Sequence, residues 1–96
     1  MRLTNYEIQS IKQAFNETFI SGNIYLFGSR VDDSQKGGDI DLYIVNHNIQ
    51  SSLLKKKLEF LTNLKQKIGF QKIDLIISKD KSRVIEKEAL KYGIEL

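Results

Sequence analysis

The sequence contains no cysteine and no proline. Without cysteine, disulfide bonds and thiolate metal sites are excluded. The first residues, Met1 to Asn5, form no apolar run of the kind that a secretory signal needs. No stretch approaches the roughly 20 apolar residues of a membrane span. These absences predict a cytoplasmic protein with no membrane partner, and the chain shows no sign of a flexible linker.

The chain also lacks a dense cluster of charges of one sign. The 96 residues carry a formal net charge of +3, and the lysines are scattered, with Lys55 to Lys57 as the densest run. A dedicated nucleic-acid binder usually shows stronger clustering, so direct nucleic-acid binding is not expected. The length and the hydrophobic fraction of 41% predict one folded domain over residues 1–96.

The spacing of apolar residues predicts helices alternating with short strands. Thr4 and Glu7 have the spacing of a capping box at the start of the first helix, and a short helical turn is expected after Ser29. The order α-β-α-β-α-β-α predicts an α+β (α/β) fold in which helices pack on a small mixed sheet. The expected helices are 4–20, 51–68 and 82–92, and the expected strands are 24–27, 39–45 and 71–78. The apolar stripe of the first helix is Ile8, Ile11, Phe15 and Phe19, and that of the second is Leu54, Leu58, Leu61, Leu64 or Lys65, and Ile68.

Three carboxylates lie on the non-aliphatic faces of two predicted strands. Because side chains alternate along a strand, Asp39 and Asp41 share one face of the second strand, and Asp74 lies opposite the aliphatic face of the third. If these strands are neighbours, the three acids converge on one patch. Such a cluster is costly without cations, and its hard oxygen ligands suit Mg²⁺ or Mn²⁺. The alternative interpretation is that the acids lie on a solvent-exposed strand face and bind no metal.

Gly28, Ser29 and Arg30 follow the first predicted strand directly. Glycine permits close approach of a phosphate to the backbone, and the following N–H groups and the serine hydroxyl can bind it. Arg30 can add a charge-assisted contact. The alternative is an ordinary strand-to-turn junction in which glycine supplies the geometry and serine caps the turn.

Gly28-Ser29, the pair Asp39-Ile40-Asp41 and the later Asp74 together resemble the nucleotidyltransferase superfamily that shares the fold of DNA polymerase β. Within it, the chain is most similar to the minimal nucleotidyltransferase (MNT) family. That resemblance implies an antitoxin paired with a HEPN-domain toxin, and transfer of AMP from ATP to a tyrosine of that toxin. It also implies two Mg²⁺ ions held by the three aspartates, and a triphosphate bound by the Gly28-Ser29-Arg30 turn.

The chain departs from the usual MNT pattern at two places. Gly38 stands where many members have serine before the first aspartate. Val31, Asp32 and Asp33 follow Arg30 where many members have Ala-Arg-Gly. A phosphate contact from the serine and a second arginine are therefore missing, which bears on how triphosphate is held.

Other functions and other roles remain open at this stage. The chain could neutralise a partner by binding alone, or transfer a nucleotide to a small molecule or an RNA end. The helix 51–68 and the segment 92–96 are candidate docking elements, although core packing is the simpler interpretation for both. Tyr43 shares the face of the acids and is a candidate to line the nucleotide site, whereas His47 is expected in an exposed turn.

Overall fold

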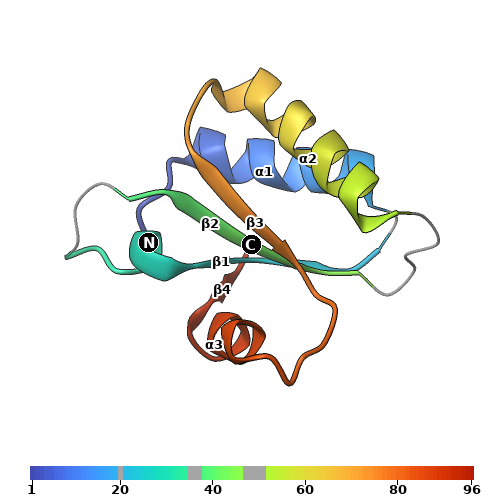
Figure 1. The fold of residues 1–96 in the computed structure, drawn as a ribbon. Coiled ribbons are helices and arrows are strands. Elements are labelled where there is room, and N and C mark those ends of the chain that lie inside the picture. Colours follow the sequence, from blue (N-terminus) through green and yellow to red (C-terminus); the bar gives the residue numbers. More distant parts are fainter. Residues whose placement is uncertain (20, 35–37, 47–51) are drawn as a thin grey trace.

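The computed structural model describes residues 1–19, 21–34, 38–46 and 52–96. A four-stranded sheet with the order β3-β2-β1-β4 forms its centre. Helices α1 and α2 cover one face of the sheet, and α3 covers the other (Figure 1). The elements are α1 Asn5–Thr18, β1 Asn23–Phe27, the 3₁₀ turn η1 Gly28–Val31, β2 Ile40–Val45, α2 Leu53–Ile68, β3 Ile73–Ile77, α3 Val84–Tyr92 and β4 Ile94–Glu95.

The start of α1 confirms the predicted capping box. The Thr4 hydroxyl accepts the Glu7 backbone N–H at 3.0 Å, and the Glu7 carboxylate accepts the Thr4 N–H at 2.9 Å. Two of the four orphan N–H groups of the helix are thereby satisfied. The stripe of α1 also lies as expected, since Ile11, Phe15 and Phe19 are buried in the main core.

The apolar stripe predicted for α2 is wrong at two positions. Leu54 and Leu58 are 64% and 56% exposed, and Phe60, which the stripe omitted, is fully buried. Phe60 contacts the Phe19 ring of α1 at a centroid distance of 6.3 Å. Because a large aromatic side chain buries more area than leucine, the packing of α2 on α1 turns the Phe60 and Leu64 side of the helix inward.

The strands pair in a mixed pattern. β1 runs antiparallel to β2, and β2 runs parallel to β3. Their alternation follows the sequence pattern, because Ile40, Leu42 and Ile44 lie in the core under α1 and α2, while Tyr43 and Val45 lie in the second core under α3. The predicted α+β class is therefore confirmed.

The C-terminal segment contains a strand that the predicted order lacks. Ile94 and Glu95 form β4, which pairs antiparallel with Leu26 and Tyr25 of β1, and the Leu96 N–H donates to the Ile24 carbonyl at 2.9 Å. Two residues are too short for an alternating pattern to show in sequence. Of the two interpretations for this segment, core packing is the one that the structure supports, since Leu96 packs against the main core.

None of the helices in the described part of the chain combines the length and apolar character that a bilayer crossing requires. His47, expected in an exposed turn, lies outside the described residues.

Candidate active site

The parallel pairing of β2 with β3 places two of the predicted acids side by side. Asp41 and Asp74 are direct partners in the register, so both side chains leave the same face of the sheet. The negative charge of Asp74 acts on Asp41 across this register pair and helps to raise its pKa. Asp41 is partly buried and Asp74 is exposed. The sequence prediction that these strands are neighbours with converging acids is thus confirmed for this pair.

The surroundings of Asp41 disfavour its negative charge. Burial raises the pKa of Asp41, and the charges of Asp74 and Asp39 raise it further, to about 6. The ammonium group of Lys72 opposes this rise and is outweighed. A carboxyl group with this pKa is partly protonated near neutral pH, and a cation placed between the acids would restore its charge.

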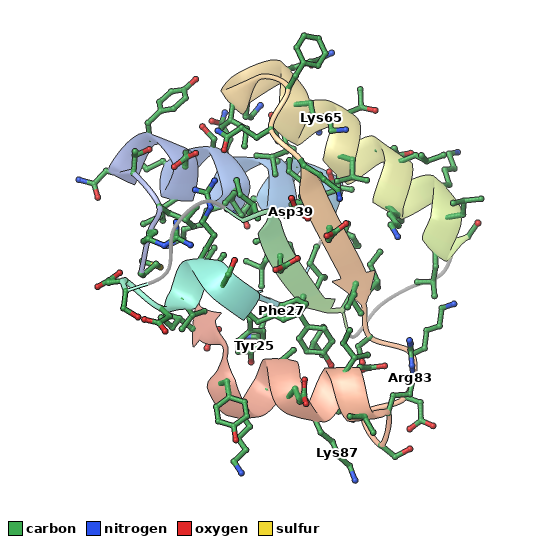
Figure 2. All side chains as sticks on the ribbon, turned by 60° about the vertical axis from the view of Figure 1, so that its left-hand side comes forward. Tyr25, Phe27, Asp39, Lys65, Arg83 and Lys87 are labelled. Carbon is green, nitrogen blue, oxygen red and sulfur yellow. The ribbon has the colours of Figure 1, made fainter. Side chains whose placement is uncertain are left out.

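Asp39 lies just before β2 (Figure 2), and its carboxylate forms an ion pair. Its Oδ2 is 3.3 Å from Nζ of Lys72, which lies two residues before Asp74 and on the same strand face. Across residues 1–19, 21–34, 38–46 and 52–96, no three His, Cys, Asp or Glu side chains are arranged to hold a metal ion. The structure therefore brings Asp41 and Asp74 together and leaves Asp39 paired with Lys72.

Gly28 brings the backbone of the predicted phosphate turn against Asp41. Its φ is +76°, a left-handed conformation that favours glycine. A Cβ atom added there would lie 2.2 Å from Oδ2 of Asp41. The contact follows from the antiparallel pairing of β1 with β2, in which Phe27 is the partner of Asp41. Glycine is therefore required at this position both by the backbone conformation and by the carboxylate beside it.

Gly38 and Ser29 show a second close approach. Gly38 has a φ of +87°, and a Cβ atom there would lie 2.2 Å from Oγ of Ser29. The serine hydroxyl thus occupies the space beside the residue that precedes Asp39. Glycine at this position therefore suits both the left-handed backbone conformation and the space that the Ser29 hydroxyl fills.

Arginine side chains fasten the Gly28–Val31 turn to the N-terminal segment. Arg2 donates from Nη2 to the Ser29 carbonyl at 3.1 Å and from Nε to the Asp32 carbonyl at 3.2 Å. Arg30 donates in return from Nη1 to the Arg2 carbonyl at 3.1 Å, and from Nε to the Gly38 carbonyl at 3.4 Å. We call these two side chains and their carbonyl partners the arginine clasp. The clasp orders the turn, and a phosphate contact from Arg30 stays a prediction.

The chain is similar to a known protein family and to solved structures. The family model described as "Polymerase beta, Nucleotidyltransferase" matches residues 9–96. The chain belongs to this nucleotidyltransferase family. Among solved structures, a mutant of the toxin-antitoxin complex MntA-HpeT contains a chain with a TM-score of 0.69 and 17% identity, over 93% of this chain and 70% of that one. A search of curated proteins found no match.

These comparisons confirm the family and the fold that the sequence motifs indicated. The matched range includes the Gly28-Ser29 turn and all three aspartates of this nucleotidyltransferase chain. At 17% identity, the likeness to the MntA-HpeT chain shows the fold alone. The roles of individual residues rest on the geometry described above.

Tyr43 does not line an open site in this nucleotidyltransferase. It is fully buried beneath α3, and its hydroxyl donates to Oε1 of Glu86 at 2.8 Å. The prediction failed because strand alternation identifies the face of a side chain and says nothing about what covers that face. Here the covering element is α3, whose Ala89 packs against Tyr43 and Val45.

Sequence reasoning missed Arg2, Lys72 and Glu86. The position of Lys72, two residues before Asp74, was a signal that could have placed it on the acid face. The Arg2 contacts span 27 to 30 residues of sequence, so no local pattern announces them. Glu86 is the fully buried charge of α3, and only the tertiary structure shows its partners.

Proposed function

We propose that this chain is a metal-dependent nucleotidyltransferase that moves AMP from ATP to a hydroxyl group of a partner toxin, and so acts as its antitoxin. The single observation that supports it best is the register pair Asp41 and Asp74, with the Gly28 backbone packed against Asp41. Family membership supports the reaction class. The partner, a HEPN-type toxin that offers a tyrosine, is proposed from the MNT resemblance and from the toxin-antitoxin complex whose fold matches.

The donor chemistry of the site fits Mg²⁺. All three candidate ligands are carboxylates, and burial together with the charges of Asp74 and Asp39 raises the pKa of Asp41 to about 6, so a cation would stabilise its charged form. Asp39 joins Asp41 and Asp74 only if its side chain rotates away from Lys72. When bound, two such ions supply charge stabilisation for the attacking and leaving oxygens.

The remaining roles belong to the residues of the chain. The Gly28–Ser29 backbone and the Ser29 hydroxyl bind the β- and γ-phosphates, next to the acids that face the α-phosphate. Asp74, the more exposed acid of the pair, orients the acceptor hydroxyl and receives its proton. The acceptor oxygen then bonds to the α-phosphorus, the bond from that phosphorus to the bridging oxygen breaks, and pyrophosphate leaves. Positioning supplies most of the rate in such transfers.

The test measures transfer of label from α-labelled ATP to the purified cognate partner in the presence of Mg²⁺. We expect the partner to be labelled and its toxic activity to be lost. Asp39→Asn combined with Asp41→Asn should abolish labelling, while Glu88→Gln, an exposed acid on α3, leaves it unchanged. Labelling that survives the double aspartate variant refutes the assigned site.

A second arm separates catalysis from binding. The double variant is mixed with the partner without ATP, and the activity of the partner is measured. Full inhibition without nucleotide or Mg²⁺ would favour the alternative in which the chain neutralises its partner by binding alone. Transfer to a small molecule or an RNA end, with no labelled partner, would support the other alternative.

A further inference from the structure

The outer edge of β3 is open in the described structure. β3 is the end strand of the sheet, and no strand of residues 1–19, 21–34, 38–46 or 52–96 pairs with its outer side. The opposite end of the sheet is formed by β4, which has two residues, whereas β3 has five. An edge of that length presents a row of unpaired backbone groups to an approaching strand.

The hydrogen bonds at the two ends of β3 identify which of its backbone groups face outward. The Lys72 carbonyl accepts from Ile40 at 3.0 Å, and the Ser78 N–H donates to the Ile44 carbonyl at 2.8 Å. Alternate residues of a parallel strand bond to the same neighbour, so those between them point their N–H and C=O groups to the open side. These outward residues are Ile73, Leu75 and Ile77.

The edge has little of the usual protection against pairing. Natural edge strands are blunted by proline, lysine, bulges or shortness. β3 reads Ile-Asp-Leu-Ile-Ile and contains neither proline nor lysine, and its one charged side chain, Asp74, lies on the face away from the main core. The side chains of its outward-bonding residues, Ile73, Leu75 and Ile77, are at most 8% exposed in the main core, which anchors the edge.

A groove of about 280 Å³ runs along this edge. Leu53, Leu54 and Lys57 of α2 line it on one side, and the three consecutive β3 residues 75–77 line it on the other. Lys79 and Arg83, from the segment between β3 and α3, also line it; Figure 2 shows Arg83 just before α3. Among the described lining residues three are cations and none is acidic.

The cations of the groove keep charge available for a ligand. Lys57 and Lys79 form no ion pair with the residues that the structure describes, and Arg83 contacts the buried Glu86 only at 3.5 Å. The carboxylate of Asp80, beside Lys79, is engaged by the Ser82 hydroxyl at 2.7 Å and the Ser82 N–H at 2.9 Å. The positive field along the edge is therefore matched by an acidic ligand.

We propose that the β3 edge binds an acidic, extended segment of a partner protein, which adds to the sheet as a further strand. Its backbone pairs with the outward groups of Leu75 and Ile77, its apolar side chains pack on Leu53 and Leu54, and its carboxylates meet the three cations. Strand addition of this kind draws affinity from main-chain hydrogen bonds and specificity from alternate side chains.

Charge disfavours the other obvious occupant, a second copy of this chain. The groove lining that a second copy would bring along its own β3 edge holds three cations and no acid, so it offers Lys57, Lys79 and Arg83 no complementary charge. The proposal goes beyond the transfer reaction and needs no nucleotide. Its test therefore contains neither ATP nor Mg²⁺, and its failure leaves the proposed transfer unaffected.

The experiment titrates the isotopically labelled full chain with short synthetic peptides and follows amide exchange by NMR. The probe alternates valine with glutamate. Matched probes replace glutamate by lysine, or carry N-methyl groups on alternate amides so that one edge cannot pair. We expect the acidic probe to slow exchange at Leu75 and Ile77. The lysine and N-methyl probes should bind at least roughly tenfold more weakly.

Charge reversal in the protein supplies the second comparison. Lys57→Glu with Lys79→Glu should weaken the acidic probe roughly tenfold. Lys65→Glu with Lys87→Glu makes the same change in net charge away from the groove and should leave binding as in the wild type; Lys87 lies on the outer side of α3 (Figure 2). The proposal is overturned if the acidic and the lysine probes bind equally, if the acidic probe does not bind, or if the amides protected from exchange lie away from Leu75 and Ile77. A dimer in which Leu75 and Ile77 are already protected assigns the edge to a second copy and overturns it as well.

Discussion

Glu86 gives the sharpest test of how this fold is stabilised, because it is a fully buried carboxylate with several donors. Oε1 accepts the hydroxyls of Tyr43 at 2.8 Å and Ser78 at 2.5 Å, and Oε2 accepts the backbone N–H groups of Lys79 at 3.1 Å and Asp80 at 3.0 Å. Burial raises the pKa of Glu86, but these hydrogen bonds outweigh it and lower the pKa to about 2. The carboxylate thus joins α3 to β2 and to the segment after β3.

Glu86→Gln keeps the shape and removes the charge. The hydroxyls can rotate to accept from the new amide, so the main loss is the stronger, charge-assisted character of the four hydrogen bonds. A fall in pKa from 4.5 to about 2 corresponds to about 3 kcal/mol between the two protonation states. We therefore expect the variant to lose about 2–3 kcal/mol of unfolding free energy at pH 7, a large share of the 5–15 kcal/mol typical of such domains.

The pH dependence has a definite sign. The folded-state pKa lies below the unfolded value of 4.5, so this stabilisation is fully present above pH 4.5 and is lost as the pH falls toward 2. The gap between wild type and Glu86→Gln should therefore shrink over that range. Urea unfolding followed by far-UV circular dichroism at several pH values measures it, with the exposed Glu88→Gln as the control on the same helix.

Two outcomes would refute this reasoning. One is a Glu86→Gln variant within about 0.5 kcal/mol of the wild type at pH 7, which is the range of ordinary surface substitutions. The other is a stability gap that does not change between pH 5 and pH 2. Either result would mean that the buried carboxylate is compensated in the variant or is not charged in the wild type.

Three further predictions concern the candidate site. Asp41→Asn should abolish transfer and raise the unfolding free energy at pH 7 by about 1–2 kcal/mol. The reason is that the pKa of Asp41 is about 6 in the folded state and 3.8 in the unfolded state, so the wild type loses stability as the pH rises through this range. Urea unfolding measures the difference, and a less stable variant contradicts the prediction. Gly28→Ala should lower the transfer rate roughly 100-fold, because the added Cβ displaces the Asp41 carboxylate. The control is Gly69→Ala, which introduces similar backbone strain at a φ of +82° but has nothing within 4 Å of the added Cβ, so the rate per folded molecule should stay unchanged. Arg2→Ala should raise the KM for ATP roughly fivefold to tenfold with a smaller change in kcat. Arg2→Lys should not restore the KM, since one ammonium group cannot reach both the Ser29 and the Asp32 carbonyls. Equal losses in kcat and KM would argue against a role of Arg2 in ordering the turn.

The elements of this fold follow from local patterns, but their packing does not. The capping box at Thr4 and the aliphatic faces of β2 and β3 are visible in sequence because they repeat with the periods of helix and strand. Several apolar stripes fit α2, and contact with Phe19 selects the one that contains Phe60. The short β4 exists only because β1 offers it an edge.

The same division applies to the candidate site. The sequence by itself determined which residues could act there: Gly28 and Ser29 at the end of a strand, and acids on the faces opposite the aliphatic ones. Only the tertiary structure decided that Asp41 and Asp74 are register partners, that Asp39 pairs with Lys72, and that Arg2 joins the turn. The physical reason is range. Alternation and helical period act over a few residues, whereas the Asp41–Asp74 register, the Asp39–Lys72 ion pair and the Arg2–Ser29 contact join residues 27 or more positions apart and depend on how the whole core closes.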